Sequence, residues 1–409
     1  MQDRIALDEA AEMAATLPVR RVAGSPTRLL DRTAWRDAAL AWLAQRILFV
    51  LAVYVGRLLT TAHGFSQQIL SWPQLFTGLF GWDANQYVRI AREGYAHGWE
   101  TAFYPVLPGL EHLLMGVFGG SPGLAGLVVA NLATLLAFGL LRVLVEREVG
   151  RRPAQRALLY LACFPTAFFL IVPYTESLFL LFSVASFLAL RRERWLLAGV
   201  CAALAELTRP LGILLVAAML AEYVARYART GQWREARRLA PLLGGMALPA
   251  LALGVFTLSL RASPSAASPI SGELATSWAR TLTFPGFGFV RAGGALLQAG
   301  LTPNAFQAHI LLDAAFTVVF IALSVVMWRR LPLAYVAYTW VTLAVVLMTP
   351  SHHWYALASN MRFMLVVFPL FMLLGVWGQR QWVDRLILIC SLPLLTIFIV
   401  AFLGGGWVA

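Results

Sequence analysis

The sequence predicts an all-α integral membrane protein, and three observations carry this prediction. Of the 409 residues, 60% are hydrophobic and only 13% are charged, whereas about 25% are charged in an average soluble domain. The mean hydropathy is +0.72. The net charge is +12, yet the basic residues, all of them arginines, fall in short clusters between long apolar runs. Such clusters are a topology signal of membrane proteins, so we expect no nucleic-acid partner.

Apolar segments along the chain predict about 11 transmembrane helices, since roughly 20 apolar residues cross a bilayer. The fifth and sixth segments are short and alternatively form one re-entrant pair broken at the sequence TRPLG. We expect one membrane domain, 38–403, between a cytoplasmic tail at 1–37 without a signal-peptide core and a short outer tail at 404–409. The expected spans are 38–62, 123–145, 157–172, 176–190, 196–207, 211–225, 239–260, 304–328, 332–349, 359–377 and 385–403.

The arginine clusters orient these spans in a cell membrane. In the eleven-span arrangement all of the clusters fall on one side, which the positive-inside rule makes cytoplasmic. The segments with unusual polar residues all fall on the other side. These are the outer loops 63–122 and 261–303 and the sequences PYTE, TRP and PSHHWYALASNMR. The sequence therefore predicts a multi-pass protein whose functional site lies on the non-cytoplasmic face.

The first outer loop is predicted to hold two interfacial helices. In WDANQYVRIAREGY, Asp83 occupies an N-cap position with Gln86 three residues on, as in a capping box, and Gly94 is a helix stop. The apolar face of this helix would hold Tyr87, Ile90 and Ala91, with an Arg89–Glu93 pair on another face. The sequence FYPVLPGLEHLLMGVFGG predicts the second helix. The other long outer loop, 261–303, is rich in Ser, Pro and Gly and is a possible lid.

Two carboxylates at the outer face are candidates for chemistry. Asp83 is explained by helix capping alone, but it lies beside Trp82 and ahead of an aromatic and proline-rich segment, so it is equally a candidate catalytic acid. Glu176 in PYTESLF begins a span, where the helix dipole stabilises a carboxylate. A polar residue facing a membrane bundle is also a functional candidate by default.

Basic residues on the same face are candidates for phosphate binding. Arg209 is three residues from Glu206, so the two either neutralise each other or leave Arg209 to bind a phosphate. His352, His353 and Arg362 are candidates for the same role, with an interfacial anchor as the alternative. Neither the adjacent histidines nor the three cysteines have zinc-ligand spacing.

The motifs resemble those of a known family. WDANQYVRIAREGY, AFYPVLPGL, FPTAFFLIVPYTESLFLLFSVASFLAL, WLLAGVCAALAELTRPLGILL and SNMRFMLVVFPLFMLLG are similar to stretches of the PIG-V type mannosyltransferases and their bacterial relatives. The resemblance covers most of the chain in order, except the N-terminal tail and the ASPSAASPIS loop. It implies a GT-C glycosyltransferase fold and an inverting transfer from polyprenyl- or dolichyl-phosphate mannose.

Carried over residue by residue, the resemblance makes Asp83 the catalytic general base. The donor-phosphate or substrate-binding residues that we expect are Tyr87, Tyr104, Tyr174, Glu176, Arg209, His352, His353 and Arg362. A glycolipid or glycan would be the acceptor. No DxD, GxGxxG, P-loop or HExxH pattern occurs, so we expect no obligatory metal or other cofactor. Alternatives are another polyprenyl-phosphate sugar, a protein acceptor, or a lipid or solute transporter.

Overall fold

The structure is a computed structural model that describes residues 29, 31–61, 77–228, 231–263, 267–269, 271–272, 279–299, 304–352 and 355–408. In these ranges all regular secondary structure is helical, apart from one isolated antiparallel bridge between Arg280 and Ser351. The all-α prediction is therefore confirmed for the described part of the chain.

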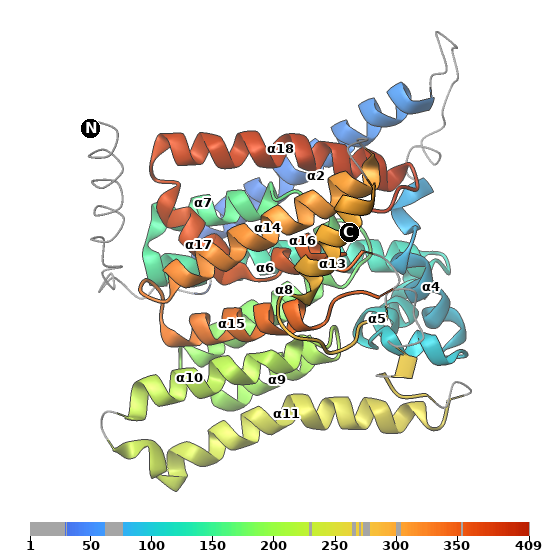
Figure 1. Cartoon of the computed structure of the whole chain (residues 1–409). Coiled ribbons are helices and arrows are strands. Elements are labelled where there is room, and N and C mark those ends of the chain that lie inside the picture. The colour runs from blue at the N-terminus through green and yellow to red at the C-terminus, as the bar shows by residue number, and fades with distance from the viewer. Residues whose placement is uncertain are drawn as a thin grey trace, which may run out of the picture.

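Each predicted span coincides with one or two helices of the structure (Figure 1). The α-helices are α2 (Arg32–Thr61), α4 (Asp83–Glu93), α5 (Val106–Leu114), α6 (Pro122–Val149), α7 (Arg151–Ala162), α8 (Glu176–Leu190), α9 (Trp195–Glu206), α10 (Leu215–Tyr227), α11 (Ala236–Leu260), α13 (Phe287–Ala299), α14 (Ala305–Met327), α15 (Leu333–Met348), α16 (Asn360–Leu365), α17 (Phe368–Trp377) and α18 (Gln381–Leu403). Short 3-10 turns connect several of them: η1 (Thr77–Phe80), η2 (Gly98–Ala102), η3 (Met115–Phe118), η4 (Ala167–Leu170), η5 (Gly212–Leu214) and η7 (Gln232–Arg234).

Five helices in the described ranges are long and apolar enough to cross a membrane, and they indicate a multi-pass membrane protein. They are the part of α2 at Arg32–Gly56, together with α6, α11, α14 and α18. The shorter apolar helices α8, α9, α15 and α17 have 10 to 16 residues each. They fall below the roughly 20 residues of a full crossing, so the predicted count of eleven spans is not confirmed.

The third predicted span is an α-helix only in its first half. α7 ends at Ala162, shortly before Pro165, and the chain continues through turns and η4. These turns lie inside the protein, where the side-chain amide of Gln45 donates to the carbonyls of Ala162 and Ala167, both at 3.0 Å. The Thr134 hydroxyl similarly donates to the Leu170 carbonyl at 2.6 Å. Non-helical backbone is tolerated at membrane depth only when it is satisfied in this way.

The first outer loop forms helices as predicted, and they lie at one end of the bundle. Figure 1 shows α4 and α5 beside the ends of the long helices. Gly94 ends α4 with φ 73°, and Tyr87, Ile90 and Ala91 are buried on its inner face, as expected. Arg89 does not pair with Glu93. It pairs at 2.8 Å with Glu100 of η2, which is fully buried, so this contact ties α4 to the next turn of the loop.

Asp83 does not cap α4, and the predicted capping box with Gln86 is wrong. The helix begins at Asp83 itself, the N-cap residue is Trp82, and no side chain caps the helix. The physical reason is a stronger competing partner, because the Asp83 carboxylate accepts a charge-assisted hydrogen bond from Arg362 at 2.9 Å. This contact turns the carboxylate away from its own helix.

Candidate active site

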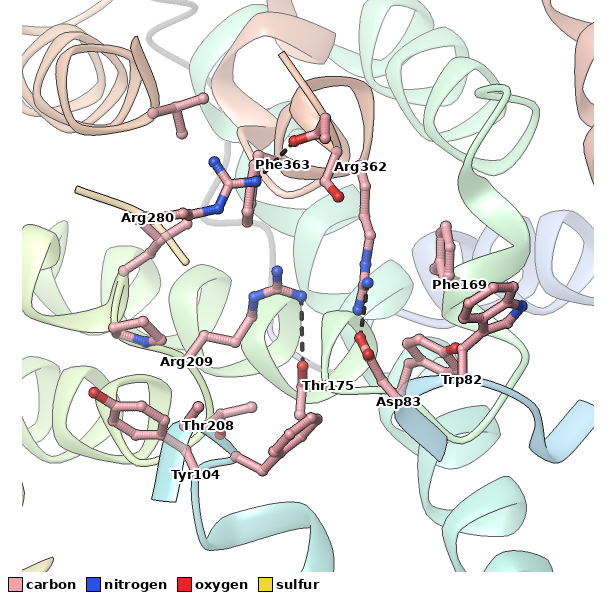
Figure 2. Close-up of a pocket in the computed structure, with 18 of the residues that line it drawn as sticks. Trp82, Asp83, Tyr104, Phe169, Thr175, Thr208, Arg209, Arg280, Arg362 and Phe363 are labelled. Carbon is pink, nitrogen blue, oxygen red and sulfur yellow. Dashed lines mark hydrogen bonds and ion pairs between the residues drawn. The ribbon is translucent and has the colours of Figure 1, made fainter. Parts of the chain in front are cut away.

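A cavity of about 430 Å³ lies at the end of the bundle where α4 begins. Polar side chains reach it from several segments: the start of α4, the segments just before α5 and α8, the turn after α9, the loop 261–303 at Arg280, and the start of α16. Residues of α15 and α18 add apolar wall. Figure 2 shows Asp83, Arg362, Arg209 and Arg280 around this space.

Glu176 joins the predicted site residues into one ion network. It is the first residue of α8 and is fully buried. One of its oxygens accepts from Arg362 Nε and also from Arg209 Nη1. Arg362 Nη1 then donates to Asp83 Oδ2 at 2.9 Å. The chain of contacts therefore runs Asp83, Arg362, Glu176, Arg209, and it joins residues that are 279 positions apart in the sequence.

Removing Arg209 or Arg362 is expected to destabilise the folded protein. A buried carboxylate is stable as an ion only when it is paired, and removing one partner of such a pair costs about 3–5 kcal/mol. The second oxygen of Glu176 has no hydrogen-bond partner among the described residues. Glu176 thus depends on Arg362 and Arg209, and in return it holds both guanidinium groups at the cavity wall.

Aromatic rings and a buried acid fix the position of Arg362. Its guanidinium carbon lies 4.5 Å from the ring centroid of Phe169 and 4.8 Å from that of Tyr174. Just before it, the Met361 backbone N–H donates to Asp313 Oδ1 at 2.8 Å. The Tyr355 hydroxyl donates to Asp313 Oδ2 at 2.5 Å. Asp313 of α14 therefore holds the first turn of the helix that carries Arg362.

Arg209 lies at the break between α9 and η5, where it is available to the cavity. Glu206 does not pair with it. Glu206 accepts instead from the Ile213 backbone N–H at 2.7 Å, which stabilises the turn. Arg209 is bonded to Glu176 and lies 3.4 Å from Thr175 Oγ1, as the dashed line in Figure 2 shows. The alternative in which Arg209 is neutralised by Glu206 is therefore wrong.

A third arginine of the cavity, Arg280, was not singled out from the sequence. It lies in the second outer loop and donates to the carbonyls of Thr349 and Ala358, each at 2.7 Å. Its guanidinium carbon lies 4.8 Å from the Phe363 ring centroid. Nothing in the sequence distinguishes Arg280 from Arg261 and Arg291 of the same loop. Pro269 also lines the cavity, so described parts of the loop named as a possible lid form cavity wall.

The remaining predicted residues divide into two groups. Tyr87, Tyr104 and Tyr174 line the cavity. Burial, with the nearby charge of Asp83 as a smaller cause, raises the pKa of the Tyr87 phenol, so it stays protonated at neutral pH. His352 is not in the cavity wall: its ring contacts the Thr281 hydroxyl, and its backbone N–H donates to the Ala279 carbonyl at 3.2 Å. His353 lies outside the described residues.

The charges of the site favour an anion together with a proton acceptor. Three arginines (Arg209, Arg280 and Arg362) face two carboxylates (Asp83 and Glu176), which leaves one net positive charge. Asp83 is 22% exposed at its side chain and reaches the cavity directly. No group of three or more metal-ligating side chains occurs among the residues that the structure describes.

Comparison with protein families finds one match, which covers part of the chain. The model of the family described as dolichyl-phosphate-mannose-protein mannosyltransferase matches residues 104–255, which is less than half of the chain. The match supports a GT-C mannosyltransferase. It suggests a membrane enzyme that uses polyprenyl-phosphate mannose, and it does not extend to the PIG-V subtype. The matched stretch contains Tyr104, Tyr174, Glu176 and Arg209. No curated protein and no solved structure matches the chain.

Proposed function

We propose that the chain transfers a mannosyl residue from polyprenyl-phosphate mannose to a hydroxyl of a glycolipid or glycan, with inversion and with Asp83 as general base. The observation that carries this proposal is the placement of Asp83 in one cavity with three arginines that leave a net positive charge. The family match independently supports the donor class.

The arginines suit the leaving group. As the bond between the anomeric carbon and the phosphate oxygen breaks, its electron pair moves to the phosphate, whose charge grows. Arg362, Arg209 and Arg280 are held in place before the reaction by Glu176 and by backbone carbonyls. Preorganised donors of this kind stabilise a transition state without further reorganisation, and they often supply the largest single contribution to catalysis.

Asp83 suits the attacking hydroxyl. The acceptor oxygen forms a bond to the anomeric carbon on the side opposite the phosphate, and its proton passes to the carboxylate. Arg362 holds Oδ2, while Oδ1 has no hydrogen-bond partner among the described residues. A carboxylate is a weak base, but it accepts the proton efficiently once the new bond is largely formed, and it orients the hydroxyl beforehand.

The direct test is Asp83→Asn in membranes supplied with polyprenyl-phosphate mannose. General-base catalysis typically contributes about 10²–10⁴-fold, so we expect transfer to fall by at least about 100-fold. Asp31→Asn is the matched control, because Asp31 lies before α2, outside the cavity, and its carboxylate bonds only to Thr33 among the described residues. Near wild-type transfer by the Asp83 variant would refute the general-base assignment.

We further propose that the reaction needs no metal ion and takes place on the non-cytoplasmic face. The guanidinium groups already supply the positive charge that a metal would supply to a phosphate. Transfer by purified protein is expected to be unchanged, within about twofold, after incubation with EDTA. Loss of activity with EDTA and its recovery with Mn²⁺ would contradict this part of the proposal.

A further inference from the structure

We propose that Trp82 is the platform on which the acceptor sugar ring stacks, so that the acceptor is a glycan and not a polypeptide hydroxyl. This inference rests on the proposed function and deepens it. Trp82 lines the cavity and directly precedes the candidate base. Figure 2 shows it beside Asp83, across the space from Arg209 and Tyr104.

The backbone at Trp82 is the first observation that points to a function. Its dihedral angles are φ 55° and ψ −125°, and it is one of three non-glycine residues with positive φ among the described residues. This region favours glycine and is costly for a bulky side chain. Residues persist in such conformations where the surroundings hold them, and they cluster at active sites and ligand clamps.

The surroundings of Trp82 hold the turn in this way. The Tyr174 hydroxyl donates to the Gly81 carbonyl at 3.1 Å. The Asn85 backbone N–H donates to the Trp82 carbonyl at 3.2 Å. The carbonyl before Trp82 and the carbonyl of Trp82 itself are therefore both held, which keeps the backbone in this conformation. Tyr174 also stacks against Arg362, so the same ring links Trp82 to the ion network.

The indole itself is the second observation, because it is partly exposed and carries no stacked ring or guanidinium among the described residues. Trp82 is 40% exposed. Three other tryptophans, Trp42, Trp99 and Trp233, each have an arginine guanidinium over the ring. Among the described residues no arginine and no aromatic ring stacks on Trp82. A large apolar surface in a cavity wall, left open beside a reactive carboxylate, is suited to a ligand with a flat apolar face.

A pyranose ring has such a face. Its C–H groups carry partial positive charge, and the π face of an indole is negative, so the two stack favourably. With the ring on Trp82, one of its hydroxyls reaches the adjacent Asp83 carboxylate. In the transfer the acceptor oxygen bonds to the anomeric carbon, the carbon–phosphate oxygen bond breaks with its electrons going to the phosphate, and the proton goes to Asp83. A serine or threonine side chain offers no comparable surface.

The experiment measures steady-state transfer from polyprenyl-phosphate mannose, first with the membranes as acceptor source and then with octyl mannoside. The mannose of the donor is labelled, and the fraction in which the label is recovered identifies the acceptor class. With wild-type protein, the label is expected in protease-resistant glycolipid or glycan. Label found in protease-sensitive protein overturns the proposal and identifies a polypeptide acceptor.

Variants of Trp82 then test the platform. Loss of aromatic stacking is expected to raise the acceptor KM roughly tenfold in Trp82→Ala, with the donor KM changed less than about twofold. Trp82→Gly is expected to raise the acceptor KM equally, although glycine relieves the backbone conformation, so it separates loss of the ring from misfolding. Trp82→Phe keeps an aromatic face and should stay within about threefold of wild type.

The control and the contrary outcomes are distinct. Trp382→Ala removes a tryptophan that is 64% exposed at the start of α18, outside the cavity, and is expected to change neither KM. If Trp82→Gly and Trp82→Ala leave the acceptor KM at the wild-type value, Trp82 is an interfacial anchor and the proposal fails. Failure of the proposed function gives a different result, namely that Asp83→Asn still transfers mannose at the wild-type rate.

Discussion

Helix α8 has an ion network at each end, and the two networks differ in charge balance. At its start, Glu176 holds Arg362 and Arg209 at the cavity. At its other end, Arg191 pairs with Glu148 at 2.7 Å and with Glu222 at 2.6 Å. The 15 residues of α8 separate the two by about 22 Å at 1.5 Å per residue.

The second network uses the same chemistry for a different purpose. Arg226 extends it, pairing with Glu222 at 2.6 Å and with Glu193 at 2.9 Å. Here three carboxylates face two arginines, so no positive charge is left over for an anion. Its members come from α6, from α10 and from the turn that follows α8, and they tie these helix ends together. An excess of arginine at a cavity indicates that the cavity binds an anion. Arginines that are matched by acids between helix ends indicate that the network stabilises the fold.

Arg362→Lys is expected to give the largest loss of turnover. It disrupts the network at the cavity and leaves the network at the other end of α8 intact. A lysine keeps the charge but cannot donate to Asp83 and Glu176 together from a planar fork. Turnover should fall about 10²–10³-fold, as when one preorganised transition-state donor is removed. The measurement is kcat in purified protein, with circular dichroism to confirm retained helicity. A kcat within threefold of wild type would show that the guanidinium is not needed for transfer.

Arg191→Met is expected to lower the stability of the protein and to leave its turnover unchanged, which is the opposite of Arg362→Lys. It leaves Glu148 without an arginine partner and Glu222 with Arg226 alone, which should destabilise the fold by about 3 kcal/mol. The thermal midpoint in detergent should drop, while turnover per folded molecule stays near wild type because the cavity is at the far end of α8. If this variant lost turnover at an unchanged midpoint, the assignment of the two networks would be reversed.

Asp313→Asn is expected to give a smaller effect, because it acts on the first network through the backbone. An amide keeps one oxygen to accept from the Met361 N–H, but its NH2 group cannot accept from the Tyr355 hydroxyl, so that contact must reverse its direction and the negative charge is lost. Arg362 should shift, and kcat should fall about tenfold with the thermal midpoint little changed, since misplaced catalytic groups lose rate steeply. A lowered midpoint with full turnover would indicate a purely structural acid.

The sequence predicted the helices well, because apolar runs and arginine clusters are local signals. Gly94 as the end of α4 and the buried face of that helix were predictable for the same reason. The predicted topology puts Asp83, Glu176, Arg209 and Arg362 on one face, and the structure joins these four residues in one ion network.

What the sequence did not predict depends on contacts between distant segments. The choice of Asp83 between capping α4 and pairing with Arg362 is decided by a residue 279 positions away. Asp313 has an unremarkable place in an apolar helix, and its contacts with Tyr355 and Met361 arise only when α14 packs beside α16. Arg280 reaches the cavity because its loop folds back onto Thr349 and Ala358, which no local pattern encodes.

In the proposed mechanism the arginines hold the lipid phosphate and Asp83 accepts the proton. The decisive measurement is the affinity of purified Asp83→Asn for polyprenyl-phosphate mannose, taken together with its turnover. Because the substitution removes a carboxylate that competes for Arg362, the Kd is expected to equal or fall below that of wild type, while turnover drops at least about 100-fold. Turnover near wild type, or binding lost together with turnover, would contradict this mechanism.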